Sequence, residues 1–120
     1  MTAKPAAAYM IPVVEATPAV IRERIESFVK IAQAMVDGYH DKNYPNIPRD
    51  VLEVSYGPRY AKIISRTPGS GSVWAFVDLS NGDILKPASF RAPAKHARGT
   101  VLAVNYGVDC CGPHGPRYLK

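Results

Sequence analysis

The chain has 120 residues, 47% of them hydrophobic and 21% charged, and these ordinary globular values exclude a wholly disordered polypeptide. Its formal net charge is +5 at pH 7, and the excess is uneven: residues 1–58 hold six Lys/Arg and seven Asp/Glu, whereas residues 59–120 hold nine and three. No segment approaches the roughly 20 apolar residues of a membrane span, and Pro5 and Pro12 interrupt any signal-peptide core, so we expect neither a membrane nor a secreted protein.

The first predicted elements are an arm and a helix. Residues 1–16 are rich in Ala and Pro and predict an extended arm, which packs as an edge strand or against a partner; a flexible terminus is the alternative. Thr17-Pro18 predicts a helix start, because Thr caps well and Pro is favoured at the first helical position. Gly38 predicts its end, so we expect a helix over residues 18–37. Apolar residues at three- and four-residue spacing predict one core stripe, formed by Ile21, Ile25, Phe28, Val29, Ala32, Met35 and Val36.

Loop and strand signals follow. Residues 39–50 predict a loop because of their two prolines, and we expect the pair His40 and Asp41 within it to be solvated. Alternating or β-branched runs predict strands over residues 51–56, 59–66, 73–79 and 84–86, with a flexible connection at 67–72 and a tight Asn81-Gly82 turn. Residues 100–108 favour a strand over a helical turn.

These elements predict a small α+β fold. We expect one long N-terminal helix packed on an antiparallel meander of three or four strands. The single domain would span residues 17–109, between the arm of residues 1–16 and a turn-rich C-terminal tail of residues 110–120.

The stretch with the clearest chemical character runs from Lys86 to Gly99. It contains five basic or imidazole side chains and no acid, and no Asp or Glu occurs between Asp83 and Asp109. Its two prolines disfavour a regular element, so it is a solvated loop or a shaped anion site. The residues that would contact phosphate are Lys86, Ser89, Arg91, Lys95, His96 and Arg98, with added charge from Arg59, Lys62 and Arg66.

Aromatic residues near this basic stretch suggest stacking on bases. Tyr60 and Phe90 are the candidates, whereas we expect Trp74 to be a core residue. The signal is not specific, because the chain contains no phosphate-binding loop, zinc-finger spacing or recognised nucleic-acid-binding signature. The alternative is a basic, soluble surface that binds no ligand.

Two adjacent cysteines, Cys110 and Cys111, lie near His114 at the C-terminal end. Adjacent cysteines rarely pair, so no disulfide framework is expected, in keeping with a reducing compartment. Paired ligand spacing typical of a zinc site is missing, and no nucleophile elbow or carboxylate pair is evident. We therefore expect no metal, no cofactor and no enzymatic activity.

The motif Gly82-Asp83-Ile84-Leu85-Lys86-Pro87-Ala88-Ser89-Phe90, followed by Pro93-Ala94-Lys95-His96-Ala97-Arg98-Gly99, resembles a group of small, mostly uncharacterised proteins of tailed bacteriophages. The similarity covers about residues 59–101, a third of the chain. It implies a phage origin and the host cytoplasm, or alternatively the virion, and it implies no particular activity.

Three functional hypotheses follow. The first is a phage accessory protein that binds a phosphate-rich ligand, most simply nucleic acid, through the basic stretch. The second is an anti-defence or host-takeover protein that sequesters a nucleotide signal or inhibits a host protein, with a homo-oligomer as one way to close the pocket. The third is a virion component whose arm of residues 1–16 laces neighbouring subunits.

Overall fold

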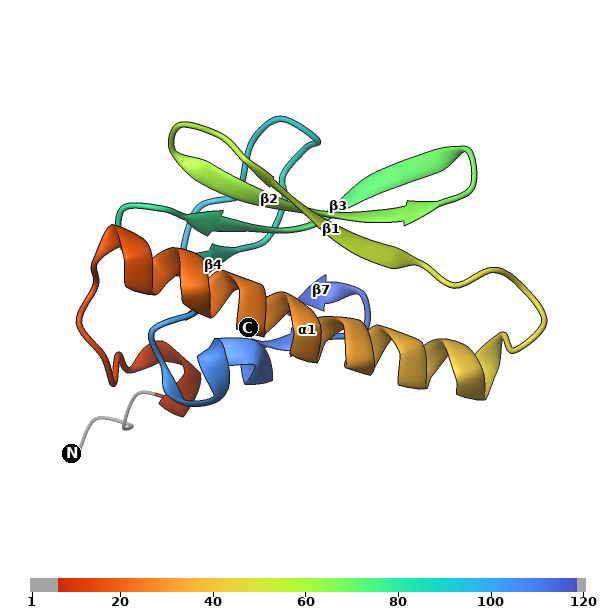
Figure 1. The fold of residues 1–120 in the computed structure, drawn as a ribbon, viewed down its shortest axis with the longest axis horizontal. Helices are drawn as coiled ribbons and strands as arrows, with labels where there is room; N and C mark the ends of the chain where they lie inside the picture. The colour runs from red at the N-terminus through yellow and green to blue at the C-terminus, as the bar shows by residue number, and fades with distance from the viewer. Residues whose placement is uncertain (1–6, 119–120) are drawn as a thin grey trace.

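The fold, seen in a computed structural model that describes residues 7–118, is one long helix packed against a β-meander (Figure 1). The single-turn helix η1 (Ala8–Met10) precedes the long helix α1 (Pro18–Asn43). The Oγ1 atom of Thr17 accepts a hydrogen bond from the backbone N–H of Val20 at 3.2 Å, which confirms the predicted cap. The outermost residues of the predicted arm and tail, 1–6 and 119–120, lie outside the described residues.

The sheet contains β1 (Val51–Tyr56), β2 (Tyr60–Thr67), β3 (Ser70–Asp78), β4 (Asp83–Leu85) and β5 (Gly99–Thr100). They pair antiparallel in chain order, which confirms the α+β meander. The sheet has five strands where three or four were expected, because the short strand β5 adds to the edge of β4. Residues 67–72 were predicted to be a flexible connection, but they continue β2 and β3 into a hairpin.

The core lies between α1 and the face of the sheet that α1 covers (Figure 1). The helix contributes the predicted stripe, including the fully buried Ile25, Phe28 and Ala32. A bulge in β3 opposite Ile63 and Ile64 leaves Trp74 unpaired in the ladder. Its ring packs 6.0 Å from that of Phe28 and is 4% exposed, so Trp74 is a core residue as expected.

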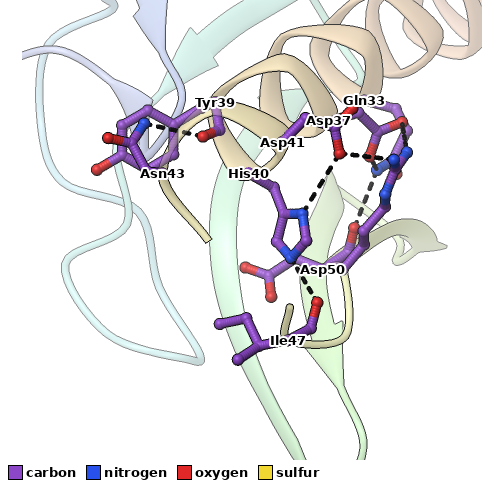
Figure 2. Close-up of polar contacts among 9 residues, drawn as sticks. Gln33, Asp37, Tyr39, His40, Asp41, Asn43, Ile47 and Asp50 are labelled. Carbon is purple, nitrogen blue, oxygen red and sulfur yellow. Dashed lines mark hydrogen bonds and ion pairs between the residues drawn. The ribbon is translucent and has the colours of Figure 1, made fainter. Parts of the chain in front are cut away.

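The C-terminal end of α1 was predicted too early. The helix passes through Gly38 and ends at Asn43, so residues 39–43 are helical and not loop. A Cβ atom at Gly38 would meet nothing within 4 Å, and one interior glycine costs only about 1 kcal/mol. The extra turn buries His40, whose Nε2–H donates to the carbonyl of Ile47 at 2.7 Å (Figure 2). His40 is therefore an anchor for the following loop, and the prediction that it is solvated is wrong.

Residues 100–108 were predicted to be a strand, and the strand ends at Thr100. The chain then forms the irregular helix η2 (Val104–Cys110), in which Asn105, Tyr106 and Gly107 have positive φ angles. The guanidinium of Arg24 on α1 donates to the carbonyls of Val101 and Ala103, which takes acceptors away from a strand neighbour. A tertiary contact to the helix thus overrides the local β propensity.

The segments at both ends of the described chain pack onto this domain. Residues 111–116 form a hairpin of β6 (Cys111–Gly112) and β7 (Gly115–Pro116), and Cys111 and Pro116 are buried. On the N-terminal side, Pro12 bridges to Ala103, and the N–H of Val13 donates to Leu102 at 2.8 Å. Within residues 7–118, no helix has the length and apolar character needed to cross a membrane.

Candidate anion-binding face

The sheet turns one face away from α1, and we call it the outer face. The register places Lys62 opposite Phe76, and Phe76 opposite Leu85. Because successive side chains alternate across a strand, these three point away from the core that their neighbours fill. The loop of residues 86–98 rises beside this face, on the side of the sheet remote from α1 (cyan in Figure 1).

The loop is irregular, as its prolines predict, but its backbone is well tied. Pro87 and Pro93 form an isolated bridge, and the N–H of Ala94 donates to the carbonyl of Lys86 at 2.7 Å. The N–H groups of Ala88 and Ser89 both donate to the carbonyl of Ala92. Since these donors are used within the loop, an anion would be held mainly by side chains and less by a nest of backbone N–H groups.

Three of the six predicted contact residues support the loop itself. The Oγ atom of Ser89 accepts from the N–H groups of Arg91 and Ala92 at 3.2 Å. The ammonium of Lys86 donates to the carbonyl of Pro116 at 2.9 Å and lies 4.1 Å from the centre of the Tyr118 ring. Lys86 thereby ties the loop to the C-terminal hairpin.

Arg98 fixes the end of the loop through hydrogen bonds to backbone carbonyls. Its guanidinium donates to the carbonyls of Lys95 and His96, and its Nε–H donates to that of Arg117 at 3.2 Å. His96 has a φ of 70°, a conformation that L-residues rarely adopt, and the two hydrogen bonds stabilise it. Arg98 is therefore a positioning residue for its two neighbours.

The other three predicted contact residues, Arg91, Lys95 and His96, are exposed and border the outer face. Two of the three strand cations considered from the sequence join them, because Arg59 and Lys62 line the same surface. Arg66 does not, since its Nε–H donates to the carboxylate of Glu53. The structure thus brings cations from β2 and from the loop together across about 30 residues of sequence.

Aromatic rings lie among these cations. The ammonium of Lys62 is 4.2 Å from the centre of the Phe90 ring, and the guanidinium of Arg59 is 5.1 Å from that of Tyr60. Tyr60 packs edge-on against Phe76 at 5.9 Å, so its ring is held in place. Phe90 is 52% exposed. Both predicted stacking residues therefore lie beside positive charge on the outer face.

Two shallow hollows open on the outer face and share Arg59 and Tyr60. The first, of about 250 Å³, also contains Lys62 and Arg91. The second, of about 390 Å³, also contains Lys95 and His96. Both are open to solvent and lie side by side, as a surface for an extended ligand requires.

The second hollow contains two carboxylates that the sequence reasoning missed. Asp78, only 6% exposed, lies 3.8 Å from the guanidinium of Arg59 and accepts hydrogen bonds from Ser80. Burial, and then the charge of Asp78, raise the pKa of Asp83. Asp83 borders the acid-free stretch in the chain and Asp78 precedes it, and the tight turn between β3 and β4 brings both acids against that stretch.

The cysteines lie away from this face. Both thiols are buried and free, with their Sγ atoms 3.5 Å apart. The hydrogen bond between them lowers the pKa of Cys110 and, with burial, raises that of Cys111. Among residues 7–118, no three His, Cys, Asp or Glu side chains gather in a way that would hold a metal ion.

Comparison with known proteins gives one match. The family model described as "Family of unknown function (DUF7717)" matches residues 4–115, nearly the whole chain. No curated protein and no solved structure matches.

Proposed function

The chain belongs to this family of unknown function, and from its outer face we propose that it binds a phosphate-rich ligand, namely single-stranded nucleic acid. The observation that carries the proposal is the contact of Lys62 with the exposed Phe90 ring, at 4.2 Å, beside Arg91. Cations at this spacing hold the phosphates, and Phe90 and Tyr60 offer faces on which bases stack. The resemblance to small phage proteins supports a role in the host cytoplasm as an accessory protein.

Single strands suit this surface better than duplexes. The cations extend over an open face, from Lys62 on β2 to Arg91 in the loop of residues 86–98, and they do not lie along a helix that could enter a major groove. Exposed aromatic rings gain contact only with bases that are free to unstack. We therefore expect a short oligothymidine to bind more tightly than a duplex of the same length.

The test is a binding titration of a labelled oligothymidine by fluorescence anisotropy at several salt concentrations. We expect Lys62→Ala and Arg91→Ala each to reduce the slope of log affinity against log salt by about 1, because each removes one phosphate contact. Phe90→Ala weakens binding about tenfold and leaves the salt slope unchanged, since it removes stacking and no charge.

Lys30→Ala is the matched control, because Lys30 is an exposed cation on α1. It should leave both affinity and slope as in the wild type. The proposal is wrong if no binding occurs at low salt, or if Lys30→Ala weakens binding as much as Lys62→Ala does.

A single nucleotide is the second candidate, favoured by the second hollow. There Lys95 and His96 face the carboxylates of Asp78 and Asp83, so one site offers both cations and hydrogen-bond acceptors. A nucleotide held in it would bind with little dependence on salt and none on chain length, which distinguishes it from an extended strand. A virion role would need the arm to reach a neighbouring subunit, but Pro12 and Val13 of the arm contact Ala103 and Leu102 of their own chain.

A further inference from the structure

A hollow with mainly apolar walls lies at the C-terminal end of α1. It has a volume of about 220 Å³ and lies between the last helical turn, the loop of residues 44–48 and the turn of the C-terminal hairpin. That volume exceeds the roughly 30 Å³ of a water molecule and falls below the range of about 300–1,000 Å³ for drug-sized ligands. It suits a compact group.

Aromatic rings form much of its wall. The rings of Tyr39 and His114 meet edge to face, with centres 5.0 Å apart, and Tyr44 lies 6.1 Å from Tyr39. The hairpin turn that holds His114 is itself anchored, because the indole N–H of Trp74 donates to the carbonyl of Pro113 at 3.1 Å. The faces of such rings carry negative potential and attract cations.

Negative charge reinforces the rings. The carboxylate of Asp50 lines the hollow and lies beside the ring of His40, near Ile47 (Figure 2). One of its oxygens accepts a hydrogen bond of 3.2 Å from the hydroxyl of Ser65, a neutral donor that holds the carboxylate in place and adds no positive charge. The hollow also lies at the last turn of α1, where the helix dipole is negative.

No lysine or arginine among residues 7–118 lines this hollow. The nearest guanidinium in sequence, that of Arg49, is paired with the carboxylates of Asp41 at 2.6 Å and Asp37 at 3.9 Å. The guanidinium is therefore directed at those two acids, whereas Asp50 lines the hollow.

We propose that this hollow binds a compact organic cation, a quaternary ammonium group such as that of choline. The rings of Tyr39, Tyr44 and His114 would surround the methyl groups, and Asp50 would balance the charge. A bare metal ion is disfavoured because the walls are mainly apolar, and an anion is disfavoured by Asp50 and the helix end. This site is independent of the anion-binding function proposed for the outer face.

The experiment titrates the full chain with choline and, in parallel, with its neutral isostere in which carbon replaces the quaternary nitrogen, and follows the NMR signals of His114 and Ile47. We expect choline to shift these signals in a saturable manner and to bind about tenfold more tightly than the isostere, as a partly desolvated cation–π contact predicts. Equal affinity of the two molecules, or unmoved signals, overturns the proposal.

Two variants separate the charge from the shape of the cavity. Tyr44 is 52% exposed, so Tyr44→Leu should leave the fold intact, and we expect it to abolish the preference for choline. Asp50→Asn should reduce that preference while the isostere binds as before. Tyr118→Leu, at a tyrosine outside the hollow that is 79% exposed, is the matched control and should change nothing. Retention of the full preference in Tyr44→Leu contradicts the aromatic site.

Discussion

The outer face and the hollow at the end of α1 differ in the charge of the side chains that surround their aromatic rings. The outer face gathers Arg59, Lys62 and Arg91 on an open surface, around rings that remain partly exposed. The hollow lacks lysine and arginine among its described lining residues, and it sets tyrosines beside a carboxylate. Each region contains aromatic rings, but the charge around the rings differs in sign.

The kind of ligand that an aromatic ring binds depends on the charge of the side chains around the ring. On the outer face, Lys62 and Arg59 lie beside the rings of Phe90 and Tyr60, so a ligand that stacks there is favoured when it also carries negative charge. In the hollow at the end of α1, a cationic ligand can lie against the tyrosine rings, as the ammonium of Lys62 lies over the Phe90 ring on the outer face. The two regions should therefore respond independently to mutation, and the following predictions test that independence.

The largest expected effect comes from Gly115→Ala in the C-terminal hairpin. Gly115 has a φ of 108°, and a Cβ atom there would lie 2.4 Å from the carbonyl oxygen of Trp74. We expect the free energy of unfolding to fall by about 3 kcal/mol, because strain and a clash with backbone combine. The displaced hairpin should also remove the choline preference. When binding is measured at a temperature where the variant is folded, oligothymidine affinity should fall less, because among the described residues the loop is hydrogen-bonded to the displaced segment only from Lys86 to Pro116 and from Arg98 to Arg117.

Gly69→Ala is the control for Gly115→Ala. Gly69 also has a positive φ, 79°, but a Cβ atom there meets nothing within 4 Å. Urea denaturation should show a loss of only about 1 kcal/mol, with both sites intact. If Gly115→Ala weakens both kinds of binding equally, the two regions are not independent.

Arg98→Ala is expected to have the next largest effect. It tests whether Arg98 positions its neighbours on the outer face or contacts phosphate itself. Loss of its three hydrogen bonds should release Lys95 and His96 and lower oligothymidine affinity about fivefold. The salt slope should stay as in the wild type, because Arg98 is proposed to touch no phosphate.

Arg98→Lys provides the matched variant. Lysine keeps the charge but cannot reach several carbonyls with one planar fork, so affinity should remain as low as in Arg98→Ala. Full recovery with lysine, or a slope reduced by about 1 in Arg98→Ala, would instead assign Arg98 to direct phosphate contact.

The smallest effect is expected for Asp83→Asn. Because the pKa of Asp83 is raised in the folded state, the folded chain holds more protons than the unfolded chain between the ordinary and the raised value. The free energy of unfolding should therefore fall slightly as pH rises through that interval. Asparagine should remove this decline, which urea denaturation at acidic and neutral pH can measure.

Asp83→Asn should also strengthen anion binding slightly at neutral pH, since it removes a negative charge from the second hollow. Asp109→Asn is the control, because Asp109 is an exposed acid outside the two hollows of the outer face. It should leave the oligothymidine affinity unchanged. A decrease in affinity on removing the Asp83 charge would indicate that this carboxylate accepts hydrogen bonds from the ligand, as the nucleotide alternative requires.

The features that could be predicted are those set by residues close together in the sequence. The helix start at Thr17 and the core stripe of α1 follow from local hydrogen bonding and periodicity, and the bounds of β1 agree with its alternating pattern. The end of α1 and the conformation after Thr100 were mispredicted, because the burial of His40 and the reach of Arg24 depend on residues distant in the chain.

Composition and local pattern are enough to predict the α+β class, the positive charge of residues 59–120 and the irregular backbone of the loop after β4. Which cations remain available for a ligand depends on tertiary contacts, because Lys86 and Arg98 bind carbonyls of their own chain whereas Lys62 turns outward beside Phe90. Tertiary packing alone brings Tyr39 to His114 across most of the chain. The physical reason is that composition and periodicity report local preference, whereas a site requires side chains whose neighbours are set by packing.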